Sequence, residues 1–136
     1  MKPVGFVTHP DYQSHHTGLT HPERPERLHA LLEHLTRTGL MNDLVQVAPR
    51  PAERQWIEQI HTPAYVSRVE QYCHGGRAII DSIDTEISPR SYEVSLLAAG
   101  GAMAAADAIM AGSLSHAFCA VRPPRHHALK DVAMGF

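Results

Sequence analysis

Three short apolar segments, each followed within a few residues by proline, constrain the fold of this chain most strongly. They cover residues 4–7, 44–48 and 116–121. Their length and composition are typical of strands that are buried in a sheet. A proline ends such a strand because it lacks the amide hydrogen that the next ladder bond needs. Segments with the apolar spacing of helices lie between them, so the sequence predicts an α/β fold with a parallel sheet and right-handed crossovers.

Four helices are expected between and after these strands. The first opens at residues 22–25 and has leucines spaced along one face, with Gly39 as its stop. A short helix over residues 53–60 is expected to bury Trp56, Ile57 and Ile60. The remaining two helices are expected to begin at Thr62-Pro63, ending at Gly75-Gly76, and at Ser88-Pro89, running to about Ala111.

The intervening segments 8–23 and 78–88 are predicted to be loops. The first of them carries four histidines, and its composition favours a solvated loop over a cluster of ligands. The second carries three acidic residues, Asp81, Asp84 and Glu86.

Composition excludes several classes of protein. The length of 136 residues suits one domain, and 43% hydrophobic residues suit a packed core. A net charge of −2 gives no basic footprint for nucleic acid. The longest apolar run, residues 96–110, is interrupted by Asp107, so neither a membrane span nor a signal peptide is expected. Two cysteines in different expected elements favour a reduced, cytoplasmic protein.

Histidine is unusually abundant, with eleven in the chain, and His126-His127 follow the third expected strand. Ligands bind outside the carboxyl ends of the strands in open parallel sheets, which is where this pair lies. Two adjacent imidazoles repel each other when both are charged, so one of them is favoured as a neutral base beside a potential acid. By itself, a His-His pair after a strand is a weak signal of function.

The residues around this pair resemble the histone deacetylase superfamily, and most closely its bacterial deacetylase-like amidohydrolases and acetoin-utilization proteins. Four motifs carry the resemblance and stand in the family's order. They are residues 21–28 (HPERPERL), 60–66 (IHTPAYV), 84–93 (DTEISPRSYE), and 122–128 (RPPRHHA) followed by 134–136 (MGF).

This resemblance implies a three-layer arginase/deacetylase-type fold and zinc-dependent hydrolysis of an acetyl amide. It implies that His127 is the general base and then acid, and that His126 assists electrostatically. Gly135 and Phe136 would line a narrow acyl tunnel. Asp84 would hold the substrate backbone at the rim, with Asp81 as the second choice. Arg27 matches an arginine beside an internal channel, although ordinary surface charge explains Arg24 and Arg27 equally well.

Two departures from the family pattern affect these expectations. Arg125 stands where many members have glycine. The family's metal ligands, an Asp-x-His and a later Asp, come from segments beyond residue 136, as does its oxyanion-stabilising tyrosine. We therefore expect an incomplete deacetylase-like domain over residues 1–136, with no metal ligand and no zinc of its own. Its substrate would be an acylated small molecule or lysine side chain.

Two alternatives remain open at this stage. One is a reduced esterase that uses the histidine pair, with or without a metal held by His15, His16 and His21. The other is a non-catalytic assembly module. In either case the third strand would lie at an open sheet edge, which favours a homodimer through that edge or through the small-residue helix over 89–111.

Overall fold

A three-stranded parallel sheet forms the centre of the computed structural model, which describes residues 3–124 and 126–135. The strands are β1 (Val4–Val7), β2 (Leu44–Gln46) and β5 (His116–Cys119), in the order β2-β1-β5. The three expected strands and the central place of the first are confirmed. β2 and β5 each end two residues earlier than expected. After each strand ends, one more backbone hydrogen bond joins it to β1, from the Val47 amide to the Phe6 carbonyl and from the Ala120 amide to the Val7 carbonyl.

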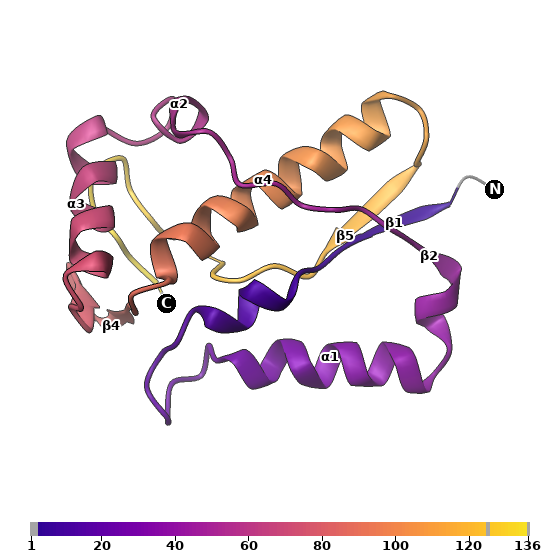
Figure 1. The fold of residues 1–136 in the computed structure, drawn as a ribbon, viewed down its shortest axis with the longest axis horizontal. Helices are drawn as coiled ribbons and strands as arrows, with labels where there is room; N and C mark the ends of the chain where they lie inside the picture. The colour runs from indigo at the N-terminus through magenta and orange to yellow at the C-terminus, as the bar shows by residue number, and fades with distance from the viewer. Residues whose placement is uncertain (1–2, 125, 136) are drawn as a thin grey trace.

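Two helices, α1 (Pro25–Arg37) and α4 (Ser91–Met110), cover opposite faces of this sheet (Figure 1). Gly101 of α4 lies so close to Val7 that an added Cβ would be 2.9 Å from a Val7 methyl. Phe6 points to the other face, as alternation along a strand requires, and joins the core cluster that contains Leu28 of α1. The expected α/β architecture is therefore confirmed.

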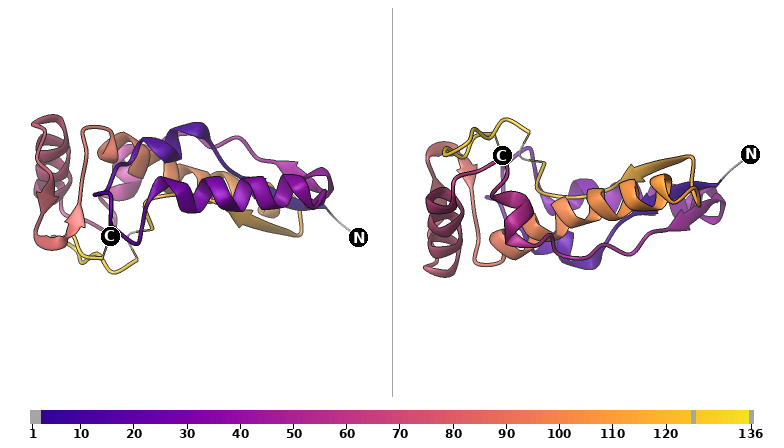
Figure 2. Two further views of the ribbon diagram at one scale, coloured as in Figure 1. Left: turned by 90° about the horizontal axis from the view of Figure 1, so that it is seen from below. Right: turned by 90° about the horizontal axis from the view of Figure 1, so that it is seen from above.

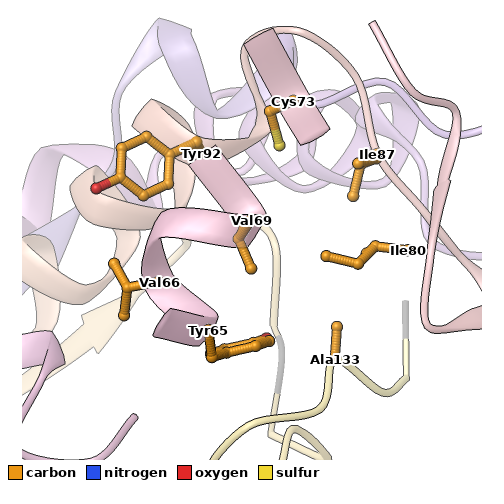
Figure 3. Packing of buried hydrophobic residues seen from close by; sticks show 8 residues of the cluster. All are labelled: Tyr65, Val66, Val69, Cys73, Ile80, Ile87, Tyr92 and Ala133. Carbon is orange, nitrogen blue, oxygen red and sulfur yellow. The ribbon is translucent and has the colours of Figure 1, made fainter. Parts of the chain in front are cut away.

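A second core lies at the end of the molecule away from the sheet (Figure 2). Here α3 (Pro63–His74) packs against the start of α4 and against an antiparallel hairpin of β3 (Ile79–Ile80) and β4 (Ser82–Glu86). Thr62 caps α3 as expected, since its side chain accepts a hydrogen bond from the Tyr65 amide. Figure 3 shows Ala133, from the C-terminal segment, facing Ile80 inside this cluster.

Three expectations about local structure are wrong. The short helix is only the single turn α2 (Arg54–Ile57), and it leaves Trp56 49% and Ile60 69% exposed. The predicted loop over 78–88 contains the β3–β4 hairpin, which turns at Asp81. The longest helix begins at Ser91, and its N-cap is Arg90 with no side-chain cap bond.

The segment over residues 8–23 is also not a solvated loop. It contains the 3₁₀ helix η1 (Pro10–Ser14), and Tyr12, His15 and Glu23 are almost fully buried. A second 3₁₀ turn, η2 (Leu40–Asp43), joins α1 to β2. The segment is drawn inward because Glu23 forms a buried ion pair with Arg122, just beyond β5.

This ion pair is the most buried of the arginine ion pairs among the described residues. The Arg122 Nε and Nη2 atoms donate to the two Glu23 carboxylate oxygens at 2.5 and 2.8 Å, and Nη1 donates to the Tyr12 carbonyl at 2.7 Å. His15 Nε2 lies 3.6 Å from the same carboxylate, and its Nδ1 shares a 2.7 Å hydrogen bond with Ser91 Oγ. The network therefore ties the N-terminal segment to β5 and to the start of α4.

Within the described residues, α4 is long and apolar enough to cross a membrane by length and composition alone, with a mean hydropathy of 1.3. One third of it is buried inside the structure. Core helices of globular proteins pass the same test, and α4 packs on β1, on β5 and on α3. The absence of a membrane partner remains a prediction.

Removing one member of the ion pair should destabilise the chain strongly. Glu23→Ala leaves the Arg122 charge buried without its partner, so the free energy of unfolding should fall by about 3–5 kcal/mol. The double substitution Glu23→Met/Arg122→Met fills the same space without a charge and should cost far less, about 1 kcal/mol for the lost bond to the Tyr12 carbonyl. Urea unfolding measures both values. A loss below about 1 kcal/mol for Glu23→Ala would contradict the strength given to this pair.

The homodimer also remains a prediction. If it forms through the edge strand β5, the backbone groups of that strand that face away from β1 would make the contact. The Ala120 amide donates to Val7, so alternation directs the amides of Ala117 and Cys119 toward the open edge, beside the half-exposed Phe118. We expect a dimer in sedimentation velocity at micromolar concentrations. Cys119→Pro should dissociate it, whereas Cys119→Val, which keeps the amide, should not. A 15.0 kDa monomer throughout that range would rule the dimer out.

Candidate functional site

The histidine pair lies on the segment that leaves β5 at the carboxyl edge of the sheet. His126 and His127 are both exposed, and their ring centroids are 4.2 Å apart with an interplanar angle of 46°. The backbone here is irregular, which allows both rings to lie together, whereas neighbouring side chains on a strand point to opposite faces. Two imidazoles in contact at the surface can accept, hold and return a proton.

Gly135 lies against the second histidine of this pair, and its place in a tunnel stays a prediction. Its φ is +67°, a conformation that glycine adopts without strain. A Cβ at this position would lie 2.7 Å from His127 Cδ2 and 2.9 Å from His127 Cβ, so the ring packs directly on the glycine backbone. Two further residues of the expected site, Arg125 and Phe136, lie outside the described residues.

The segment between the pair and Gly135 is tied to the second core. The Thr62 amide donates to the Lys130 carbonyl at 3.0 Å, and the Ala133 amide donates to Asp81 Oδ2 at 2.7 Å. Arg68 binds both oxygens of the same Asp81 carboxylate and also the Asp131 carbonyl. The Arg68 hydrogen bonds, and then the Ala133 amide, hold the pKa of Asp81 below its usual value. Asp81 therefore anchors this segment, and its place as the second choice for substrate binding stays a prediction.

Asp84, the first choice for the rim, is exposed on β4. Its carboxylate accepts hydrogen bonds from Ser82 and Thr85, and the Ser82 bond is the main cause that lowers its pKa. Its carbonyl is 3.1 Å from His21 Nε2, which ties the predicted rim to the first motif. The carboxylate is thus charged and accessible, as a group that accepts substrate amides must be.

Arg27 is exposed on α1 and borders a hollow of about 210 Å³. Glu23, Cys119 and Arg122 line the same hollow. A larger, apolar cavity of about 340 Å³ lies between α3, α4 and the segment that leads to the histidines. Pro123, Pro124 and Ala128 close it on that side. Arg27 therefore faces a cavity close to the end of β5, although no described contact gives it a role.

No group of three or more His, Cys, Asp or Glu side chains that could hold a metal occurs in residues 3–124 and 126–135. The histidines of the 8–23 segment do not form a ligand cluster there. His15 is engaged by Ser91 and Glu23, and His21 bonds the Glu23 and Asp84 carbonyls. The described residues therefore do not fit a catalytic zinc, which needs three protein ligands.

Sequence reasoning missed the two groups that hold the site in place. Glu23 and Arg122 were noted only as members of the first and last motifs, and Asp81 only as the second choice for substrate binding. The spacing of charged residues gives no signal for a pair 99 positions apart. The one available signal was an arginine directly after an apolar strand, where burial requires an anionic partner.

Comparison with known proteins identifies the family. Residues 21–136 match the histone deacetylase domain. The chain is 37% identical to a probable deacetylase of Archaeoglobus fulgidus over 135 residues, which are 98% of this chain and 37% of that protein. It is 37% identical to the histone deacetylase-like amidohydrolase of Pseudomonas aeruginosa over 116 residues, which are 85% of this chain and 30% of that protein. It is also 31% identical to the human polyamine deacetylase HDAC10 over 119 residues, which are 84% of this chain and 18% of that protein.

The fold agrees with these sequence relationships. The crystal structure of the HDA15 HD domain superposes with a TM-score of 0.90 at 28% identity, over 98% of this chain and 39% of that one. The chain thus spans between 18% and 39% of the length of these four relatives. The four motifs, the sheet order and these relationships agree that the chain belongs to the histone deacetylase family.

Proposed function

We propose that this chain supplies the catalytic histidine pair and part of the substrate rim of a deacetylase site, and that it lacks the family's metal ligands. The proposal rests chiefly on one observation: His126 and His127 contact each other, and Gly135 packs against the second ring. The substrate class is an acetyl or acyl group on an amide or an ester, carried by a small molecule or a lysine side chain.

The chemistry assigned to this chain is proton transfer. In hydrolysis, water adds to the acyl carbon while His127 takes a proton from the water. His127 then returns that proton to the departing amine or alcohol, and an acid is released. The centroid of the His126 ring is 4.2 Å from that of His127. A neutral His126 would stabilise the positive charge that His127 acquires with the proton. Asp84 would orient the substrate by accepting hydrogen bonds from its backbone.

Zinc supplies electrophilic activation of the water and the carbonyl when it is bound in this family. The described residues of this chain do not provide a set of ligands for it, so we assign no step of this chain to the metal. Without that activation, and without a carboxylate that orients either imidazole in the described hydrogen bonds, we expect weak hydrolysis of amides. Activated esters need less assistance, so they are the substrates on which the pair alone could act.

Substitution of the two histidines tests this proposal. With a chromogenic acetyl ester, His127→Ala should lower the rate more than His126→Ala, within the range of about 10²–10⁴-fold that is typical of general acid–base catalysis. His34→Ala, an exposed histidine in the last turn of α1, is the matched control and should leave the rate unchanged.

This assay also distinguishes the proposed function from the two alternatives, a reduced esterase and an assembly module. A rate that falls with His127→Ala and persists in a chelator supports a reduced esterase, whereas loss of the rate in the chelator indicates a metal. If no hydrolysis is detected, the chain is better described as an assembly module. Equal and negligible effects of the two substitutions on a measurable rate would remove the pair from the mechanism.

A further inference from the structure

The histidine pair lies between two anchors, and each anchor contains a carboxylate without a role in the proposed chemistry. The segment from Arg122 to Gly135 leaves β5, carries the pair, and returns to the core formed by α3 and the hairpin (Figure 1). Its first residue is held by Glu23, and its return is held by Asp81.

The upstream anchor fixes where the segment starts and in which direction it runs. Three hydrogen bonds hold the Arg122 guanidinium, and the residue is only 4% exposed. Pro123 and Pro124 follow, and each proline ring locks its φ near −65°. The backbone directly after the buried cation is therefore restricted at these two residues.

The downstream anchor fixes the surface on which His127 rests. Asp81 binds the Arg68 guanidinium and the Ala133 amide with one carboxylate. Ala133 is 2% exposed and lies among the apolar side chains of the second core (Figure 3). Gly135, two residues later, is in contact with the His127 ring. The position of that ring thus depends on Asp81 through a short series of contacts.

We propose that Glu23 and Asp81 are positioning residues for the histidine pair. Glu23 acts through Arg122 and sets the approach of the segment to His126. Asp81 acts through Ala133 and sets the contact of Gly135 with His127. This proposal rests on the proposed function, since it assigns these residues to the same site, but it concerns ring geometry and is measured without any catalytic activity.

Variants that retain the fold can distinguish a role in positioning the histidine pair from a role in the stability of the chain. Glu23→Met/Arg122→Met removes the ion pair and leaves an apolar filling in its place. Asp81→Gly removes the carboxylate at a residue whose φ is +57°, which glycine adopts without strain. Asp81→Asn is the conservative variant, because asparagine also tolerates this conformation and its amide oxygen can still accept from Ala133.

The control is Arg54→Gln. Arg54 also makes several side-chain hydrogen bonds, to Glu58, Glu70, Ser67 and the Pro63 carbonyl. None of these partners belongs to the segment from Arg122 to Gly135. The control therefore removes a comparable set of bonds from α2 and α3 and leaves both anchors intact.

The experiment is NMR spectroscopy of the whole chain. In the parent protein we expect nuclear Overhauser cross-peaks between the rings of His126 and His127, and between the His127 ring and the Gly135 α protons. Asp81→Gly should abolish the His127–Gly135 cross-peak, and Asp81→Asn should restore it at least in part. Glu23→Met/Arg122→Met should abolish the cross-peak between the two rings, and Arg54→Gln should leave all of them in place.

The outcome is interpreted only where the amide signals of β1 and β5 show that the fold is kept. If Asp81→Gly fails to fold, Arg68→Gln tests the same anchor from its other side. Cross-peaks that persist in both anchor variants would overturn the proposal, as would their absence from the parent protein. A chain that hydrolyses no substrate but shows the expected losses would refute the proposed function alone.

Discussion

A charged arginine is buried at the carboxyl end of β5, and much of the structure follows from the need to neutralise it. Burial of an unpaired cation costs several kcal/mol, so Arg122 needs an anionic partner and acceptors for its remaining donors. Glu23 and the Tyr12 carbonyl supply these. Both belong to the N-terminal segment, which is consequently drawn into the core, and His15 and Ser91 extend the network to the start of α4.

The same constraint accounts for what could and could not be read from the sequence. Strands β1, β2 and β5 were predictable because each is a local apolar run closed by proline. Helix α1 was predictable from the local spacing of its leucines, and α3 from its Thr62 cap and its local spacing. The burial of residues 8–23 could not be predicted, because it depends on the ion pair of Glu23 with Arg122, 99 residues further along the chain. Trp56 and Ile60 were expected in the core from their spacing, but α2 is too short to present a continuous face.

The candidate site shows the same division. Its histidines and Gly135 were identified through the resemblance to a family, and the structure brings them into contact. Asp84 is exposed on β4, and its role at the rim stays a prediction. Asp81 was the second choice for the rim, and the sequence could not show that its carboxylate binds Arg68 and the Ala133 amide. Sequence motifs thus located the candidate reacting groups, whereas the ion pair and the carboxylate on either side of them became apparent only from tertiary contacts.

The central claim is that Arg122 is locked in a buried, bidentate ion pair, and NMR of its guanidinium group tests this most directly. We expect separate, slowly exchanging Nη proton signals for Arg122, because three hydrogen bonds block rotation and burial excludes water. Arg77, which is exposed and stacks on the Tyr72 ring, should show averaged signals under the same conditions. Averaged Arg122 signals, indistinguishable from those of Arg77, would contradict the account.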